Sequence, residues 1–251
     1  MRRLAVLALA AVLLLCACGE NTQPIAGEIE RAVGTLAAKT AFGGDYLLEI
    51  SVSGESKTTL YYAKGVFGRD SAAKTAYTSF DQSWFGMSAV SENYYSDGRI
   101  VSINDGEVIT AEREPDDVFL KFPYSVPEGY GSSCRGLSAE PNTRGKAVTF
   151  TRGGSSEFCE SVVGGDLYTL AYVIKDPQPE KTVYGDVKCI YTLSGGELIS
   201  AGYEFDVTLF DTPSYVPGYS QPEEDYSIKL HVVAKVNYSD EYEIKEYSGE
   251  E

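Results

Sequence analysis

The sequence predicts an α+β protein in which antiparallel β-strands dominate, with a strongly curved sheet and few helices. Its composition favours strands and turns over helices, with 19 tyrosines and 25 glycines but only 2 methionines in 251 residues. Apolar and polar residues alternate in several segments, most clearly near the C-terminus. A single segment near the N-terminus has its apolar residues at helical spacing instead.

That segment predicts an amphipathic helix over residues 24–39. Proline is favoured in the first turn of a helix, and Pro24 stands there. A helix with one apolar stripe buries that side, so we expect this helix to cover one face of the sheet. The stripe consists of Ile25, Ile29, Val33 and Leu36.

The next part of the chain predicts an antiparallel meander. Alternation begins at Asp45 and indicates a strand with one buried face, and further strands are expected at residues 58–66 and 74–80. Two Asp-Gly pairs, at residues 97–98 and 105–106, then separate short apolar runs. Asp-Gly tolerates the positive φ angles of two-residue hairpins, so each pair predicts a tight turn between strands.

The middle of the chain, residues 112–144, predicts a long irregular excursion rich in proline and glycine. A short helical turn is expected within it, at residues 116–120. A strand is predicted at residues 147–151, followed by a segment rich in Ser and Glu that contains Cys159. Residues 166–174 are ambiguous between strand and helix.

The last third predicts the longest strands. Residues 183–193 and 198–210 form a hairpin around a Ser-Gly-Gly-Glu turn, and residues 226–236 repeat the alternation. Odd-numbered positions from Ile199 to Leu209 are all apolar. Eleven residues at about 3.4 Å each give roughly 37 Å of strand, and strands of that length are typical of curved or barrel-like sheets.

The charge and the single histidine exclude several classes of function. The formal net charge is −16, which disfavours nucleic acid and anionic lipid headgroups as partners. Because His231 alternates with Leu230 and Val232, we expect it on the solvent-exposed face, away from any catalytic group. No Cys-x-x-Cys pair, Gly-x-Ser-x-Gly elbow or phosphate-binding glycine loop occurs. No catalytic residue, metal site or cofactor is therefore predicted.

The N-terminus has the pattern of a secretory signal. Arg2 and Arg3 precede an apolar run that is too short to span a bilayer as a helix. The following Leu15-x-Ala17-Cys18 resembles the lipobox of bacterial lipoproteins. This resemblance implies removal of residues 1–17, acylation of Cys18, a short tether at residues 18–23, and an extracytoplasmic protein anchored to the cell membrane. The alternative is an ordinary signal peptide with a chance cysteine.

The order of these elements resembles the LolA–LppX-like family of lipoprotein and lipid carriers. The resemblance implies that residues 24–251 form one half-barrel domain, whose sheet curls around an apolar cavity plugged by helices. A lipid or other apolar ligand would bind there. Alternation aims five side chains at this interior, and they form the predicted wall: Tyr203, Phe205, Val207, Leu230 and Val232.

A second hypothesis assigns the same apolar face to a packed core. The protein would then be a non-enzymatic interaction module at the cell surface, with the tyrosine-rich residues 124–130 and 215–219 contacting a protein or a glycan. Alternation alone does not distinguish a filled core from an open cavity. In either case we expect a monomer.

Three cysteines remain after the signal and the anchor are accounted for, and an odd number in an exported protein predicts one disulfide and one thiol. We expect the disulfide between Cys134 and Cys159, because both lie in segments predicted to be irregular. Cys189 shares its strand face with Val187 and Tyr191 and is the expected thiol. Pairings that use Cys189 are the alternatives.

The anchor can be tested directly. Replacement of the acylated cysteine, Cys18→Ala, should move the protein from the membrane fraction to the medium and abolish its labelling by a radioactive fatty acid. Unchanged labelling in this variant would contradict acylation at Cys18.

Overall fold

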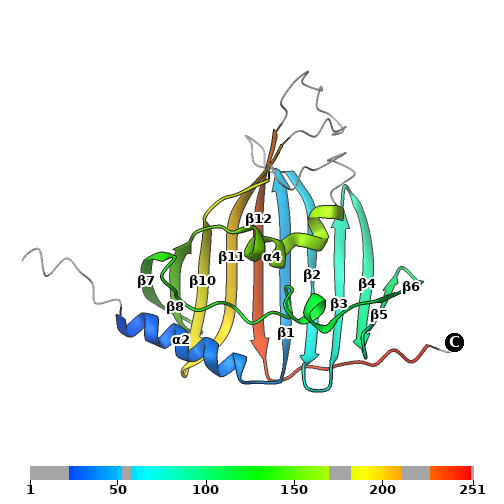
Figure 1. Ribbon diagram of the computed structural model, residues 1–251, viewed down its shortest axis with the longest axis horizontal. Helices are drawn as coiled ribbons and strands as arrows, with labels where there is room; N and C mark the ends of the chain where they lie inside the picture. Colours follow the sequence, from blue (N-terminus) through cyan, green and yellow to red (C-terminus); the bar gives the residue numbers. More distant parts are fainter. Residues whose placement is uncertain (1–22, 53–57, 170–181, 211–226, 250–251) are drawn as a thin grey trace, which may run out of the picture.

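In its described residues, the fold is one large antiparallel sheet with three helices beside it (Figure 1). The computed structural model describes residues 23–52, 58–169, 182–210 and 227–249. The sheet has 12 strands in the order β6-β5-β4-β3-β2-β1-β12-β11-β10-β8-β7, with β9 paired to β11. The helices are α2 (Gln23–Ala37), α3 (Pro115–Phe119) and α4 (Ser156–Thr169). The strands are β1 (Ala41–Val52), β2 (Thr58–Asp70), β3 (Thr75–Trp84), β4 (Met87–Ser96), β5 (Arg99–Asn104), β6 (Glu107–Glu112), β7 (Cys134–Asn142), β8 (Gly145–Arg152), β9 (Val183–Tyr184), β10 (Val187–Ser194), β11 (Glu197–Phe210) and β12 (Ser227–Ser239).

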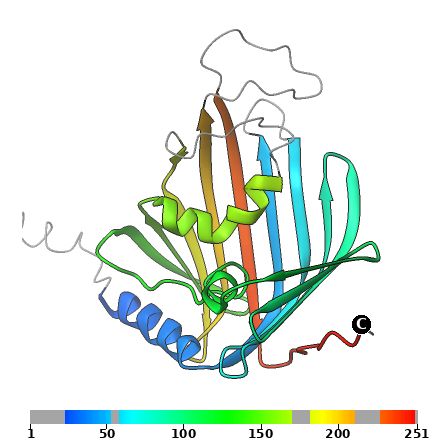
Figure 2. The ribbon, with the colours of Figure 1, turned by 45° about the vertical axis from the view of Figure 1, so that its right-hand side comes forward.

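The sheet is curved and open, with β6 and β7 at its two edges. Figure 2 shows it curling around α4 and the segment that contains α3, so these elements lie on the concave face. This arrangement confirms the predicted α+β class, a curved antiparallel half-barrel covered by a few helices. Within the described residues, no helix combines the length and the apolar character that crossing a membrane requires.

β1 and β12, the first and last strands along the described chain, are neighbours at the centre of the sheet. β1 pairs with β12 over ten residues, from Gly43 opposite Ser239 to Val52 opposite Leu230. The four strands around this seam are the longest, with 12 to 14 residues each. One cross-strand row illustrates the result, because Phe205, Val232 and Ile50 are direct neighbours on three strands and all are buried. The seam therefore builds one continuous apolar surface from both ends of the chain.

Helix α2 is close to the prediction and lies across one end of the concave face (Figures 1 and 2). It buries Ile29, Ala32 and Leu36 in the core that also contains the apolar faces of β1, β11 and β12. Ile25 and Val33 from the predicted stripe are half-buried against the same core.

The two Asp-Gly turns occur as predicted. In the turn between β4 and β5, Asp97 has φ 50° and Gly98 has φ 81°. In the turn between β5 and β6, Asp105 has φ 48° and Gly106 has φ 88°. Positive φ at both central residues is the geometry that Asp-Gly accommodates, so the turn residues fix the register of this meander.

The C-terminal segment, residues 240–249, packs on the outer face of the sheet. Gly43 and Gly68 are direct cross-strand partners and make room for it. A Cβ atom at Gly68 would lie 2.8 Å from the carbonyl oxygen of Glu243 and 3.0 Å from Ile244. Further along, Tyr247 packs on Tyr94 with ring centroids 5.7 Å apart. Because these two glycines lack side chains, they leave a groove that holds this segment.

Two elements lie where the sequence predicted irregular structure. Strand β7 falls inside the excursion expected at residues 112–144, which also contains α3 as expected. β7 is an edge strand that buries only Leu137 and contains Pro141, so it lacks the alternation of a central strand. Helix α4 occupies the Ser- and Glu-rich segment around Cys159, and its Gly164 and Gly165 are weak helix formers.

Two further predictions are corrected in the last third of the chain. The strand expected at residues 183–193 is divided at Gly185 into β9 and β10, and the Gly185 N–H donates to the carbonyl of Asp206 over 2.9 Å. Ile199 is only half-buried, because the register shifts between Leu198 and Ser200 and leaves it unpaired with β10. Leu198, Ser200 and Ala201 are the buried residues at this point.

Candidate ligand-binding interior

The five predicted wall residues lie together on the concave face. Phe205 is opposite Val232 and Val207 is opposite Leu230 on the two neighbouring strands, while Tyr203 is the next inward residue of β11. All five side chains are buried, with exposed fractions of 0 to 6%. The structure thus places these five side chains on one surface, while their role in ligand binding stays a prediction.

A second layer, which we call the cover, lies on this wall. It comprises residues 114–133, including α3, together with residues 155–169, including α4. Figures 1 and 2 show both parts in front of the concave face. The two parts are joined by a backbone hydrogen bond of 2.9 Å from Phe122 N–H to the carbonyl of Ser161. In the part of the chain that the structure describes, the backbone hydrogen bond between the cover and the sheet is a turn contact of 3.0 Å, from Cys134 N–H at the start of β7 to the carbonyl of Gly131. Elsewhere, side chains make the attachment.

Aromatic rings make much of this attachment. Phe158 of α4 packs edge-on against Tyr203, with ring centroids 5.3 Å apart, and Tyr130 packs in the same way against Phe150 of β8 at 5.4 Å. Phe122 contacts Tyr46 of β1 at 5.7 Å. Such edge-to-face contacts contribute about 0.5–1.5 kcal/mol each beyond their buried area. They hold the cover on the sheet without the directional hydrogen bonds that join neighbouring strands.

Polar attachment on one side is centred on Glu128. Its carbonyl accepts a hydrogen bond of 2.8 Å from the Tyr191 hydroxyl, and its carboxylate lies 2.7 Å from the guanidinium of Arg152. The same guanidinium lies 4.1 Å from the ring centroid of Phe158. Burial raises the pKa of Tyr191 well above its usual value, so its hydroxyl remains a proton donor to this carbonyl.

Arg69 makes the polar attachment on the other side. It is 9% exposed, and its guanidinium donates to the carbonyl of Tyr124 over 2.7 Å and to that of Phe119 over 3.4 Å. The ring of Phe42 lies 4.7 Å from its central carbon. Burial lowers the pKa of Arg69 because it disfavours the charged form, although Asp70 acts in the opposite direction.

Polar atoms remain unsatisfied near this attachment. Within the described residues, three buried side-chain atoms have no hydrogen-bond partner: Arg69 Nε, Tyr238 Oη and Arg152 Nε. Phe42 lies between Arg69 and Tyr238, since its ring contacts both residues.

Arg69 and Arg152 were not predicted as site residues. If β2 is followed through Asp70, alternation places Arg69 inward with Phe67, whereas the predicted strand ended at residue 66.

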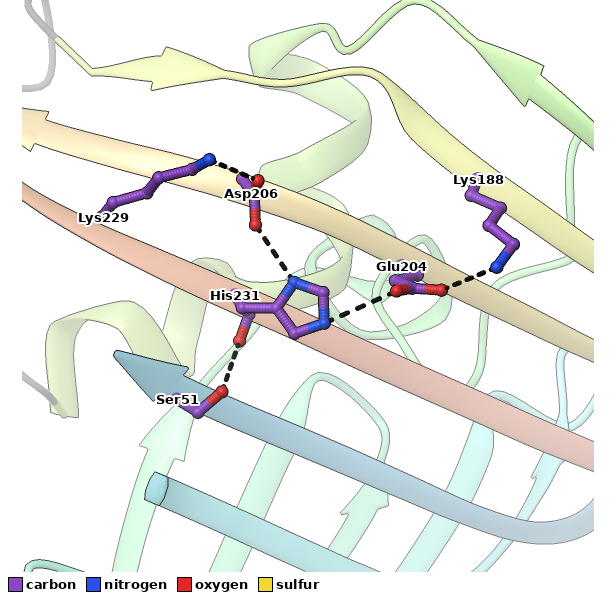
Figure 3. Close-up of polar contacts among 6 residues, drawn as sticks. All are labelled: Ser51, Lys188, Glu204, Asp206, Lys229 and His231. Atoms are coloured by element: carbon purple, nitrogen blue, oxygen red, sulfur yellow. Dashed lines mark hydrogen bonds and ion pairs between the residues drawn. The ribbon is translucent and has the colours of Figure 1, made fainter. Parts of the chain in front are cut away.

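The outer face of β10, β11 and β12 carries charged side chains, as Figure 3 shows. His231 Nδ1 lies 3.0 Å from Asp206 Oδ1, and His231 Nε2 lies 3.7 Å from Glu204 Oε1. Lys188 pairs with Glu204 at 3.1 Å and Lys229 pairs with Asp206 at 2.8 Å. His231 thus lies on the face opposite Leu230 and Val232, as predicted.

The carboxylate of Asp206 is held in its charged form. Partial burial favours the neutral acid, but hydrogen bonds from Lys229 and His231 outweigh it and lower the pKa of this carboxyl. Within the described residues, no group of three or more His, Cys, Asp or Glu side chains is placed to hold a metal ion. Lys188 is directly opposite Glu204 and His231 is directly opposite Asp206, so this cluster is a cross-strand ladder that stabilises the outer face.

The remaining predicted residues have varied outcomes. Cys134, Cys159 and Cys189 are free thiols in the structure, so the disulfide predicted between Cys134 and Cys159 stays a prediction. Tyr124 and Tyr130 are half-buried and pack their rings on Phe67 and Phe150, so these tyrosines face the core. Residues 215–219 and Cys18 lie outside the described residues.

Several solved structures are remotely similar to this chain. No family model and no curated protein matches the sequence. The lipoprotein LppX of Mycobacterium tuberculosis is 8% identical over 89% of this chain and 99% of its own, with a TM-score of 0.45. A LolA superfamily protein of Nitrosomonas europaea is 9% identical over 85% of this chain and 90% of its own, with a TM-score of 0.27. At these scores the likenesses establish neither a family nor a function.

The attachment of the cover by Arg69 predicts a local effect of its loss. Arg69→Met removes the donor to two buried carbonyls, and a buried group left without its partner costs about 1–3 kcal/mol. Hydrogen exchange should therefore accelerate at residues 118–125 while the amides of β11 and β12 keep their protection. The exposed Arg99→Met on β5 is the matched control and should change neither region. Equal acceleration across the whole sheet in Arg69→Met would contradict a separable cover.

Proposed function

We propose that this protein is a membrane-anchored extracytoplasmic lipoprotein that binds a hydrophobic ligand, a lipid or an acyl chain, between its curved sheet and its cover. One observation carries the proposal. The concave face is continuously apolar across β11, β12 and β1, and the described cover is attached to the sheet through side chains except at the turn from Gly131 to Cys134. A layer attached in this way can separate from the wall while the strand ladders stay intact.

The energies involved are compatible with such an exchange. Opening would break the hydrogen bonds of Arg69 and Tyr191 and the ion pair of Arg152, which together contribute about 2–6 kcal/mol. Each methylene buried contributes about 0.8 kcal/mol, so ten methylenes of an acyl chain would contribute about 8 kcal/mol. A bound chain would also replace the apolar contacts that the cover gives up. Its burial can therefore offset the opening.

The N-terminus supports the proposed location. The lipobox-like Leu15-x-Ala17-Cys18 would place the acylated residue only a few positions before α2, which begins at Gln23. At roughly 3.5 Å per extended residue, a tether of that length holds the domain close to the lipid surface. The net charge of −16 repels anionic headgroups, so the covalent lipid would be the main attachment to the membrane.

An interaction module at the cell surface is the second candidate, and one observation favours it. The wall residues are already buried at 0 to 6% exposure by the protein's own cover. A wall that never parts from its cover would simply be a packed core. The two candidates therefore differ in whether the covered face can be reached by a ligand.

Two substitutions on one strand separate the candidates. Phe205→Glu places a charge on the wall, and a charge opposes an apolar guest by several kcal/mol unless it is paired. In a carrier, this variant should lose binding of the fluorescent dye N-phenylnaphthylamine and keep a cooperative melting transition. Thr208→Glu places the same charge on the outer face of β11 and should keep both properties.

A milder wall variant distinguishes a loss of ligand binding from simple unfolding. Val207→Thr preserves shape but adds a hydroxyl to a side chain with 0% exposure, and it should weaken dye binding while the fold persists. A wild-type protein that never binds the dye, together with a Phe205→Glu variant that unfolds, would reject the carrier in favour of the interaction module.

A further inference from the structure

The three cysteines of the described chain belong to both layers of the structure. Cys134 lies on β7 and Cys189 on β10, and both pack in or against the interior core. Cys159 lies on α4 in the cover and is fully buried. Any bond between Cys159 and either of the other two would therefore join the cover to the sheet.

The strand register excludes a direct pairing of the two sheet cysteines. Cys134 is opposite Arg152 on β8, while Cys189 is opposite Phe150 on β8 from the other side. Two strand spacings of about 4.8 Å separate β7 from β10, so these Cα atoms lie at least about 10 Å apart. A disulfide requires Cα atoms within about 7 Å. Among these three cysteines, an intramolecular bond must use Cys159.

The neighbours of Cys159 indicate which partner it has. Phe158 packs against Tyr203 of β11, and Tyr203 is the direct cross-strand partner of Cys189. Glu160 accepts a hydrogen bond of 3.1 Å from Tyr184 of β9, which also pairs with β11. β10 adjoins β11, whereas β7 lies two strands further away. These contacts bring Cys159 toward Cys189.

The linker before α4 agrees with this placement. The chain leaves β8 at Arg152 and passes Gly185 so closely that a Cβ atom at Gly154 would lie 2.0 Å from the Gly185 carbonyl oxygen. Gly185 stands just before β10, so the chain crosses the start of that strand as it enters α4. The first turns of α4 therefore lie near the start of β10 and beside β11.

We propose that Cys159 and Cys189 form a reversible disulfide that latches α4 onto the sheet. This pairing replaces the one expected from the sequence, in which Cys134 was the partner of Cys159. The S–S bond forms as each thiol loses its proton, and the two electrons pass to a disulfide oxidant, which leaves as two thiols. Reduction by a dithiol reverses the step.

Burial should control when this bond forms. Burial raises the pKa of the Cys159 thiol to about 12 and that of the Cys189 thiol to about 12, so little thiolate exists while the cover is closed. Thiol–disulfide exchange proceeds through the thiolate. Oxidation therefore requires α4 to lift, and the bond then retains the closed cover. That retention would also slow ligand exchange, a consequence that rests on the proposed function.

Peptide mapping tests the bond itself. The full chain is incubated with oxidised glutathione, alkylated with N-ethylmaleimide under denaturing conditions, and digested without reduction. We expect a crosslinked peptide that contains Cys159 and Cys189, with Cys134 alkylated. The variant Cys134→Ala should retain this peptide and Cys189→Ala should lose it. Complete alkylation of Cys159, or a crosslink from Cys159 to Cys134, would overturn the proposal.

Release of N-phenylnaphthylamine tests the consequence. Oxidation should slow dye release by about tenfold or more in wild type and in Cys134→Ala, because the bond stabilises the closed state. It should have no effect in Cys189→Ala. An equal rate in oxidised and reduced wild type would show that the bond does not latch the cover. A crosslinked protein that never binds dye would contradict the proposed function and leave the disulfide established.

Discussion

The pairing of β1 with β12 is the constraint on which this structure depends. It joins two strands that are separated by most of the chain, so the N-terminal meander and the C-terminal hairpin become one sheet. Without this seam, β1 through β6 and β7 through β12 would be two smaller sheets, and β1 and β12 would become additional exposed edges. Closing such a long loop has a conformational entropy cost that grows only slowly with length, and the buried row through Ile50, Val232 and Phe205 offsets it.

The seam also divides the molecule into two chemically different faces. Alternation along β12 and along β11 from Ala201 onward turns every second side chain to the concave side and leaves the charged residues of Figure 3 outside. A large negative charge is thereby compatible with a predominantly apolar interior. Because hydrogen bonds within the sheet complete the strands, the cover is not needed to satisfy their backbone. Its role is to shield the wall, and side chains such as Arg69 and Tyr191 are sufficient for that.

Much of this arrangement could be predicted from the sequence, because local chemistry specifies it. Asp97 and Asp105 precede glycines in hairpin turns, and the period of two along β11 places Phe205 and Val207 on the wall. Helix α2 is likewise encoded in one apolar stripe.

The parts that could not be predicted depend on contacts distant in the sequence. The seam is formed between residues about 180 positions apart, and no local pattern reports it. The bulge at Ile199 and the inward Arg69 depend on where neighbouring strands begin and end. The sequence of helix α4 is rich in polar residues and glycine, so helix propensity does not predict it. Its position on the wall is determined by the contact between Phe158 and Tyr203.

The central claim is that the wall can exchange its own cover for a ligand. Native mass spectrometry of the full chain, extracted from its membrane in mild detergent, tests this claim most directly. The account predicts a mass above that of the acylated chain, which returns to the acylated mass when the same sample is denatured, because the additional lipid is held noncovalently. A native mass that equals the denatured mass, in protein that also fails to take up added lipid, would contradict it.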